Sequence, residues 1–503
     1  MPSDRRVTIM SMEKDSRKKF FFTGEQKDIP SIRKKREGGK IAATLEEAFR
    51  LAEVRDGMTI SFHHHLRDGD LVVNMALDVL AKMGIRDLVL APSALFPVHE
   101  DILRHVRSGV VRSIEGSVNG PVGRAASEGL FSSPVILRSH GGRARAMQSG
   151  ELHVDIAVIG APAADAMGNL SGISGPSACG SLGYAFTDAQ YADRVIAVTD
   201  NLVSYPAVPF SIPQTLVDWV VPVERIGIPE KIVSGTLRVT RDPLRLIIAR
   251  QVAKIVEESG LFLDGFSMQA GAGGISLAAS AFIREKMKAA GIRGSFISGG
   301  ITGQSVEMLE EGLFSSLLDV QSFDLEAVAS LASNRNHAEM SASFYANTAS
   351  KGCSVDMLDV AVLGATQVDL DFNVNVNTES DGILLHGVGG HMDTAAGAAM
   401  TVIVTPLFRG RMPMVVDRVL TVTTPGNTVD VVVTERGVAV NPQRKDILEN
   451  LRGKGIPLVE IGDLKKMAEE LTGVPAAPLF GEKVIGIVEY RDGTIIDTIR
   501  QRV

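Results

Sequence analysis

Cysteine is almost absent from this sequence, which has only Cys179 and Cys353 among its 503 residues. Two cysteines so far apart exclude a disulfide framework and a cysteine-based zinc site, so we expect a protein of the reducing cytoplasm. There is also no run of about 20 apolar residues, so we expect no membrane-spanning helix. Hydrophobic residues nevertheless make up 45% of the chain, and glycine occurs 50 times. This composition is typical of an α/β protein with many glycine turns.

An excess of positive charge is lacking too, because the formal net charge is −7. We therefore expect no binding to nucleic acid or to an anionic membrane. Residues 1–40 are the exception, with 12 Lys and Arg against 6 Asp and Glu, a local net charge of +6 that leaves −13 for residues 41–503. We interpret this segment as a basic N-terminal arm, which is either a solvated tail or a contact for an acidic partner.

One unit of the sequence occurs twice: a helix, an Asp-Gly pair, a strand, a loop, a second helix and a second strand. The first copy begins with a helix capped by Thr44 and the second with a helix capped by Asp242. A strand, helix and strand at this spacing predict a parallel βαβ unit, with ligands at the carboxyl ends of the strands. We therefore predict an α/β protein of two similar, open, mainly parallel domains, over residues 41–230 and 231–503.

Two glycine-rich loops are candidate catalytic elements. One lies between a predicted strand and a predicted helix, and the other comes later in the second domain. Glycines at such a place let the backbone approach a ligand and direct N–H groups at an anion or a developing oxyanion. A dinucleotide-binding loop is excluded because residue 276 is Ser where the third glycine would stand. The candidate residues are Gly271, Ala272, Gly273, Gly274, Gly387, Gly389 and Gly390.

Histidines occupy the equivalent loop of the first copy. His63, His64 and His65, followed by Arg67, form a candidate carboxylate-binding loop, because imidazoles donate hydrogen bonds and a guanidinium offers a planar fork. A metal site would need His63 and His65 to converge, and solvated loop histidines are the other alternative. We predict no metal.

A third candidate element is the alternating segment 367–377, which has the period of a strand with one polar face. Its amides would lie on one side of that strand, where they suit an oxygen-rich substrate or simply a solvated sheet face. The candidate substrate-binding residues here are Asn375, Asn377, Glu379 and, after the second glycine loop, His391.

The two glycine loops and the segment 432–439 resemble the CoA-transferase and acetyl-CoA hydrolase superfamily. Residues 61–67 and 168–173, Ser-Phe-His-His-His-Leu-Arg and Gly-Asn-Leu-Ser-Gly-Ile, are similar to the citrate lyase alpha subunit family in particular. The resemblance implies a transferase that exchanges acetyl for citryl on an acyl carrier thiol, within an ATP-independent citrate lyase complex. The implied partners are a carrier (gamma) subunit with a phosphoribosyl-dephospho-CoA arm and a beta subunit that cleaves the citryl thioester. An oligomer without a tightly bound cofactor is expected.

One departure from the superfamily bears on mechanism. Typical CoA-transferases carry a glutamate after the first of these loops, as the covalent acyl acceptor. Residues 293–305 contain no carboxylate, and Ser295 or Ser298 occupies the corresponding place. We therefore expect no glutamyl-thioester intermediate, and the resemblance to the citrate lyase alpha subunit family implies direct exchange through a mixed anhydride. The malonate decarboxylase alpha subunit, a citramalate-specific relative, another CoA-transferase and a non-catalytic carrier-docking scaffold remain alternatives.

Overall fold

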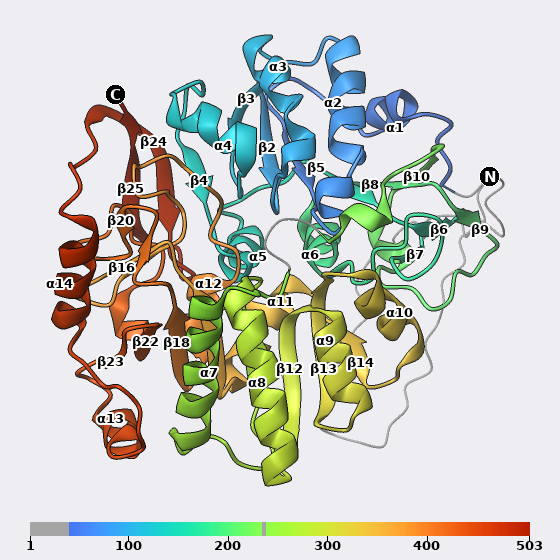
Figure 1. Ribbon diagram of the computed structural model, residues 1–503. Helices are drawn as coiled ribbons and strands as arrows, with labels where there is room; N and C mark the ends of the chain where they lie inside the picture. Colours follow the sequence, from blue (N-terminus) through green and yellow to red (C-terminus); the bar gives the residue numbers. More distant parts are fainter. Residues whose placement is uncertain (1–39, 234–237) are drawn as a thin grey trace, which may run out of the picture. The chain divides into compact units, whose positions relative to one another are not determined.

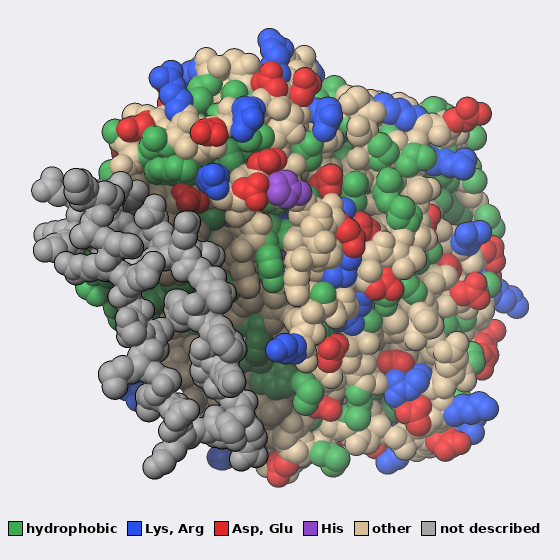
Figure 2. Space-filling view, turned by 180° about the vertical axis from the view of Figure 1, so that it is seen from behind, with side chains coloured by type: hydrophobic (Ala, Val, Ile, Leu, Met, Phe, Trp, Pro, Cys, Tyr) green, Lys and Arg blue, Asp and Glu red, His purple; other side chains and the backbone are tan. Residues whose placement is uncertain are grey.

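The computed structural model describes residues 40–233 and 238–503. The predicted basic arm lies, except for Lys40, outside these described residues. No helix of the described part is both long enough and apolar enough to cross a bilayer. On the face drawn in Figure 2, acidic and basic side chains are interspersed over the described surface.

The first half is built on a six-stranded sheet in which every neighbouring pair is parallel. Helices α1 to α4 lie with this sheet, and α5 and α6 lie toward the second half (Figure 1). The strands in spatial order are β10 (Trp219–Pro222), β8 (Arg194–Thr199), β5 (Ile156–Gly160), β1 (Thr59–Phe62), β2 (Leu88–Pro92) and β3 (Val111–Ile114). The helices are α1 (Leu45–Leu51), α2 (Val72–Lys82), α3 (Ile102–Arg107), α4 (Gly120–Ser127), α5 (His140–Ser149) and α6 (Gly183–Tyr191).

The second half contains an eight-stranded sheet, parallel except for its last pair. Its strands in spatial order are β14 (His337–Glu339), β13 (Phe314–Ser322), β12 (Gly294–Ile301), β11 (Met268–Ala270), β15 (Val360–Gly364), β18 (Met400–Val404), β22 (Val431–Thr434) and β23 (Gly437–Val440). Its helices are α7 (Pro243–Glu258), α8 (Gly274–Ala290), α9 (Gly303–Glu310), α10 (Leu325–Ser333), α11 (Ala342–Ala346), α12 (His391–Gly397), α13 (Lys445–Leu451) and α14 (Ile461–Thr472).

The two sheets repeat one topology. The order β3-β2-β1-β5-β8-β10 in the first sheet corresponds to β13-β12-β11-β15-β18-β22 in the second, which adds β14 and β23 at its edges. The predicted mainly parallel α/β fold is confirmed, including both βαβ units. As the sequence predicts, Thr44 caps α1 by accepting the N–H of Glu47, and Asp242 caps α7 by accepting that of Leu244. The boundary near residue 230 stays a prediction.

A second duplicated feature follows the equivalent strands of the two sheets, β5 and β15. In the first half, Asp165 accepts the backbone N–H and the side-chain amide of Asn169. In the second half, Asp369 accepts the same two groups of Asn373. Each turn joins small strands: β6 (Ala163–Asp165) to β7 (Leu170–Ser171), and β16 (Gln367–Asp369) to β17 (Val374–Asn375). The single strand predicted over 367–377 is therefore wrong, because a buried Asp–Asn turn interrupts it.

Other short strands complete these small sheets. They are β9 (Leu202–Val203) beside β6, β21 (Val415–Val416) beside β16, and the hairpin of β19 (Phe408–Arg409) and β20 (Met412–Pro413).

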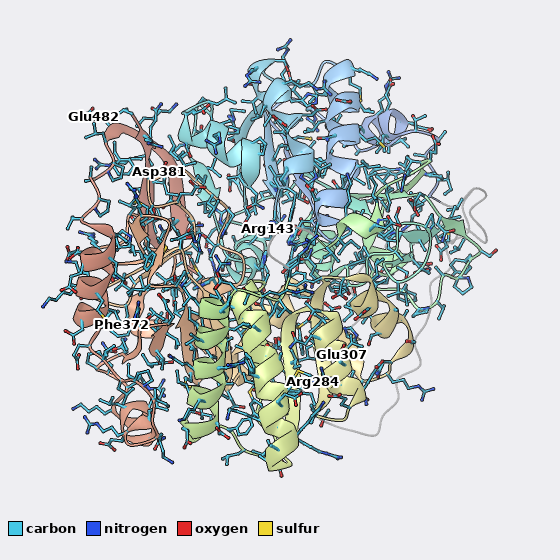
Figure 3. All side chains as sticks on the ribbon, viewed as in Figure 1. Arg143, Arg284, Glu307, Phe372, Asp381 and Glu482 are labelled. Atoms are coloured by element: carbon cyan, nitrogen blue, oxygen red, sulfur yellow. The ribbon has the colours of Figure 1, made fainter. Side chains whose placement is uncertain are left out.

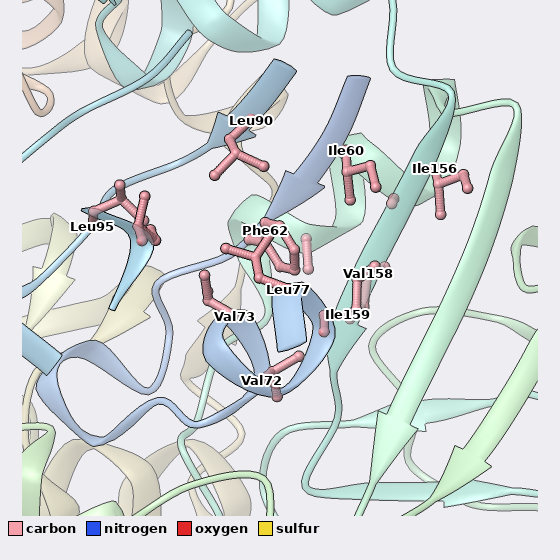
Figure 4. Close-up of a cluster of buried hydrophobic side chains, with 14 of the residues drawn as sticks. Ile60, Phe62, Val72, Val73, Leu77, Leu90, Leu95, Ile156, Val158 and Ile159 are labelled. Atoms are coloured by element: carbon pink, nitrogen blue, oxygen red, sulfur yellow. The ribbon is translucent and has the colours of Figure 1, made fainter. Parts of the chain in front are cut away.

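The apolar core of the first half lies around β1, α2 and β5. Phe62, Leu77 and Val158 are at most 1% exposed and pack together there (Figure 4). Burying side chains of this size stabilises the fold by roughly 1.5–3 kcal/mol each. The core fixes β1, and therefore the histidine loop that follows it.

The end of the chain crosses back to the first half. Strand β24 (Phe480–Glu489) pairs in parallel with β4 (Val135–Leu137) and antiparallel with β25 (Ile495–Arg502) (Figure 1). Beside this pairing, the Glu489 carboxylate accepts 3.0 Å hydrogen bonds from the guanidinium groups of Arg138 and Arg145. All three residues are buried, so the charges compensate one another out of water.

Replacing Glu489 by Gln removes the negative charge that Arg138 and Arg145 share. The two buried guanidinium groups then repel each other without a carboxylate between them. Each arginine keeps a second carboxylate, Glu115 or Glu151, so we expect a loss at the lower end for a broken buried pair, about 3 kcal/mol. Urea unfolding monitored by circular dichroism measures it. The control is Glu482→Gln, exposed on the same strand (Figure 3), which should change the free energy of unfolding by less than about 0.5 kcal/mol. Equal effects of both changes would contradict the buried-charge account.

Candidate active site

The histidine loop and the first glycine loop both follow the carboxyl end of a parallel strand, β1 and β11 respectively. The amide of Gln321, in β13, donates a 2.7 Å hydrogen bond to the carbonyl of His64 and so joins the two halves. Arg67 bridges them again, because its guanidinium carbon lies 4.9 Å from the ring centres of both Phe96 and Phe323. Phe323 in turn lines a pocket with Gly271 and Ala272 of the glycine loop. The two predicted loops therefore border one site.

The three consecutive histidines have different roles in the structure. The Nε2 atom of His63 lies 2.9 Å from a carboxylate oxygen of Asp188, which also accepts two 2.6 Å hydrogen bonds from Arg143. His65 points its Nε2 at the carbonyl of Gly160, 2.7 Å away. The His64 ring has its Nδ1 2.6 Å from the Ser93 hydroxyl, and the His64 carbonyl is the group that Gln321 contacts from the second half. His63 and His65 thus have different polar partners, although their rings stack with centres 6.2 Å apart.

Asp188 is the charged centre beneath these histidines. It is fully buried, and Arg143 lies between the two halves (Figure 3). Burial by itself raises the pKa of Asp188. The opposing effect of Arg143 and His63 is larger, so the pKa of Asp188 lies well below its usual range. The carboxylate is therefore ionised and holds the His63 ring and α5 in place.

Two aromatic groups that the sequence did not indicate lie beside His64. Tyr184 of α6 stacks on His64 with ring centres 4.5 Å apart, and His140, the first residue of α5, lies 4.4 Å from Tyr184. Burial, and to a smaller extent the charge of Arg143, lowers the pKa of His140 to about 3. Burial, and to a smaller extent His140, lowers the pKa of His64. Burial raises the pKa of Tyr184. All three are therefore neutral at pH 7 and keep a proton to donate. No local pattern marks His140 or Tyr184 in the sequence.

Arg67 supplies positive charge to the same region. Burial lowers its pKa, to about 10, which still leaves the guanidinium protonated at pH 7. One cation and several neutral donors in a buried cleft suit a ligand with carboxylate groups.

The second glycine loop is attached directly to His140. The backbone N–H of His140 donates to the carbonyl of Gly389 at 2.9 Å. Four residues further on, the Asp393 carboxylate accepts the hydroxyl of Ser139 at 2.7 Å and the N–H of Gly141 at 2.9 Å. Burial raises the pKa of Asp393 to about 6, against the opposing effect of these bonds. The segment from Gly389 to Asp393 is thus hydrogen-bonded to the start of α5.

A buried amide and phenol connect the two glycine loops. The Gln269 side chain, at the end of β11, donates a 2.8 Å hydrogen bond to the Tyr345 hydroxyl. A side chain at Gly390 would meet that hydroxyl, and one at Gly299 would come within 2.7 Å of Gln269. A larger residue at either position would have to displace one of these polar side chains. Gln269 and Tyr345 therefore connect the first glycine loop to the second through direct contacts.

The candidate substrate-binding amides, Asn375 and Asn377, form hydrogen bonds within the second half of the chain. Asn375 donates to the Thr378 hydroxyl, and Asn377 donates to the His386 carbonyl and accepts from Thr423. Glu379 is exposed. The imidazole of His391 lies 2.6 Å from the Thr424 hydroxyl and 2.9 Å from the Gly364 carbonyl, so both its nitrogens are engaged. These contacts stabilise the chain around the second glycine loop.

The two candidate positions for the absent glutamate are both on β12. Ser295, near its start, donates to the Phe266 carbonyl, and Ser298 lies buried with its hydroxyl 3.2 Å from that of Ser354. The pocket beside the first glycine loop has no carboxylate among its described lining residues, which are Met268, Ala270, Gly271, Ala272, Leu277, Ser280, Ile297, Gly300, Thr302, Gln304, Ser305, Met308 and Phe323.

The comparisons with known proteins agree with one another. The family model "Citrate lyase, alpha subunit" matches residues 38–502. The citrate lyase alpha chain of Klebsiella pneumoniae is 51% identical over 463 residues, which cover 92% of this chain and 91% of that one. A Streptococcus mutans structure described as a citrate lyase alpha subunit in complex with citrate has a TM-score of 0.91 and 48% identity, covering 93% and 92% of the two chains.

A more distant likeness concerns the fold alone. The malonate decarboxylase alpha subunit from Acinetobacter baumannii has a TM-score of 0.62 and 16% identity, covering 87% of this chain and 93% of that one.

The neutral state of His140 has a thermodynamic consequence. As pH falls below about 6.5, the unfolded chain takes up a proton on this residue, whereas the folded chain does not until about pH 3. Stability therefore falls with decreasing pH by about 1.4 kcal/mol per pH unit for this one residue. The variant His140→Gln should lack that contribution. As the pH is lowered from 6 to 4.5, its free energy of unfolding should therefore fall less steeply than that of the unmodified protein, by about 1.4 kcal/mol per pH unit. Urea unfolding at several pH values measures both slopes.

The control for that comparison is His153→Gln, which removes an exposed histidine. A change in slope as large as that of His140→Gln would show that the effect does not depend on the buried position of His140. Parallel curves for His140→Gln and the unmodified protein would show that His140 takes up its proton in the folded state as well.

Proposed function

Because the chain belongs to the citrate lyase alpha subunit family, we propose that it exchanges acetyl for citryl on the thiol of an acyl carrier protein. Its family makes it a transferase of citrate metabolism and a subunit of a citrate lyase complex. The observation that carries the finer proposal is the cluster of Arg67, His64, Tyr184 and His140, which Phe323 and Gly389 connect to the two glycine loops.

In this proposal the first half of the chain holds citrate. Arg67 provides the charge-assisted contact to one carboxylate, and the neutral rings of His64, His140 and Tyr184 donate hydrogen bonds to oxygens of the others. Neutral donors suit this role, because several buried cations would repel one another when the site is empty. The Streptococcus mutans relative, whose structure contains citrate, supports citrate as the ligand.

The second half stabilises the reacting carbonyl. A citrate carboxylate oxygen attacks the acetyl carbonyl of the thioester. The C–S bond breaks, the carrier thiolate departs, and an acetyl-citryl anhydride is formed. The thiolate then attacks the citryl carbonyl, the anhydride C–O bond breaks, and acetate leaves. Each step passes through an oxyanion, for which N–H groups of the glycine loops are the donors. No side chain carries the acyl group, which agrees with the absence of carboxylates from the described pocket lining.

The proposed partners follow from the same chemistry. They are a carrier (gamma) subunit that bears a phosphoribosyl-dephospho-CoA arm and a beta subunit that cleaves the citryl thioester, in an oligomer with no tightly bound cofactor. We also propose a cytoplasmic location, where Cys179 and Cys353 would remain the buried free thiols of the structure.

The test measures acetate release from acetyl-carrier or acetyl-CoA by the purified chain. We expect release that depends on citrate, and a loss of about 10²- to 10³-fold in turnover in Gly273→Val. A Cβ at Gly273 would meet only the Ser276 hydroxyl, at an ordinary contact distance of 3.9 Å, so the variant should fold while the valine blocks the N–H groups. The matched control is Gly462→Val on α14, where a Cβ meets no atom within 4 Å.

Other outcomes decide between the alternatives. Release that depends on malonate would indicate a decarboxylase subunit, and no release with either acid would indicate a docking scaffold. Normal turnover in folded Gly273→Val would reject the oxyanion role of the first glycine loop.

Direct exchange makes a further prediction about covalent intermediates. Acetyl-CoA without citrate should leave no CoA bound covalently to the protein, and borohydride or hydroxylamine should not inactivate it. Ser295→Ala and Ser298→Ala should retain most activity, because neither hydroxyl acts as a nucleophile. Mass spectrometry after trapping is the measurement. A modified peptide that contains Glu379 or Glu435 would overturn the anhydride route but not the transferase assignment.

A further inference from the structure

The residues just before Tyr184 lie directly against the second half of the chain, where the start of α6 contacts β13 (Figure 1). A Cβ at Gly180 would come within 2.0 Å of the Ser322 hydroxyl oxygen. A Cβ at Gly183, the first residue of α6, would come within 2.3 Å of the Met340 carbonyl oxygen. The backbone that leads into α6 is therefore packed as closely as glycine allows against β13 and the end of β14.

Hydrogen bonds from polar groups of the second half hold the same backbone. The Glu339 carboxylate, at the end of β14, accepts the N–H of Leu182 at 2.5 Å. The Ser181 hydroxyl donates to the Asp319 carbonyl at 2.9 Å. Burial raises the pKa of Glu339, against the opposing effect of hydrogen bonds from Ser211 and Leu182. Glu339 thus binds the chain two residues before Tyr184.

The strand that carries Glu339 is itself fixed. Glu339 pairs in parallel with Asp319 of β13. The buried Asp319 carboxylate accepts the Ser322 hydroxyl at 2.6 Å and lies 3.2 Å from the Nε2 of His337, at the start of β14. The other ring nitrogen of His337 lies 3.0 Å from the Ser330 hydroxyl. Glu339 therefore reaches α6 from a strand whose position is set by a buried polar network.

Tyr184 is the second residue of α6, so its ring moves with the start of this helix. The ring stacks on His64, with centres 4.5 Å apart, and its centre lies 4.4 Å from that of His140. A shift of the helix start would therefore move the phenol relative to both histidines. A ligand that contacts all three rings would detect such a shift as the loss of one contact.

We propose that Glu339 is a positioning residue for Tyr184: from the second half, it fixes the place at which the first half offers its phenol to a carboxylate ligand. This inference rests on the proposed function, in which Tyr184 donates a hydrogen bond to citrate, and it adds a residue that does not contact the ligand. Without the Glu339 carboxylate the buried N–H of Leu182 lacks its acceptor, so the segment has to move to find another.

The experiment measures citrate binding and turnover in Glu339→Ala. Calorimetric titration with citrate should give a dissociation constant roughly tenfold higher than that of the unmodified protein, as for the loss of one hydrogen bond to a charged group. The KM for citrate in acetate release should rise by about the same factor. The kcat at saturating citrate and the KM for acetyl-CoA should change by less than about twofold, because the contact serves binding of citrate.

A double-variant comparison tests whether Glu339 acts through Tyr184. Tyr184→Phe removes the phenol hydroxyl and should by itself raise the dissociation constant of citrate roughly tenfold. Adding Glu339→Ala to Tyr184→Phe should raise it by less than about a further twofold, because both changes remove the same contact. Losses that multiply in the double variant would overturn the proposal.

Conservative variants separate the oxygen acceptor from the charge. Glu339→Gln keeps an oxygen for the Leu182 N–H, and the Ser211 hydroxyl can accept from the new amide, so citrate binding should stay within about twofold. Glu339→Asp keeps the charge but is one methylene shorter and should weaken binding in the direction of Glu339→Ala. If Glu339→Ala does not fold, Glu339→Asp carries the test. Weakening by Glu339→Gln as large as that by Glu339→Ala would contradict the positioning role.

The matched control is Gln148→Ala, which removes a different hydrogen bond between the halves. The Asn347 amide donates to Gln148 at 2.7 Å, at the far end of α5 from His140. Citrate binding should be unchanged in this variant. A loss equal to that of Glu339→Ala would show that any loosening of the two halves has the same effect, and would overturn the specific role of Glu339.

Failure of this inference differs from failure of the proposed function. If only the inference fails, the unmodified protein and folded Glu339→Ala and Glu339→Asp bind citrate equally well. If the proposed function fails, the unmodified protein binds no citrate in the titration and releases no acetate, which overturns both.

Discussion

The structure of the cleft depends on one carboxylate, that of Asp393. It accepts hydrogen bonds from Ser139 and from the N–H of Gly141, and so anchors the second glycine loop, which belongs to one half of the chain, to the first turn of a helix in the other. The His140 N–H adds a backbone contact to Gly389. Because a helix start has unpaired N–H groups, it can bind a carboxylate closely. The position of His140 relative to the glycine loops is thereby fixed.

Burial of polar groups on this scale is tolerated because almost every charge has a partner. Asp188 lies between Arg143 and His63, and Glu489 lies between Arg138 and Arg145, each out of contact with water. Replacing such groups by apolar ones would often stabilise a fold, so their presence here indicates a demand for geometry. The rings that face the cleft differ from these pairs, since His64, His140 and Tyr184 are neutral.

Local patterns in the sequence predicted the duplicated βαβ units, since capping residues and strand–helix spacing act over short distances. They also located the histidine and glycine loops, because ligand loops follow parallel strands. The pairing of β4 with β24 could not be foreseen, as its partners are about 350 residues apart. His140 and Tyr184 were missed for the same reason. The strand over 367–377 failed because alternation of Asp and Asn also describes a side-chain-capped turn.

Duplication explains how a single chain came to hold two kinds of loop around one cleft. The sheets share the order of six strands, so the turn after β1 and the turn after β11 are equivalent places in equivalent halves. At the first place side chains fill the turn and contact one another. At the second, glycines leave the backbone bare, and a Cβ at Gly273 would have only the Ser276 hydroxyl within 4 Å. In the proposed function, side chains recognise a carboxylate ligand, while bare N–H groups can reach a carbonyl oxygen without reorganising. The proposal therefore divides recognition and oxyanion stabilisation between the two halves, so that neither copy of the fold would supply both.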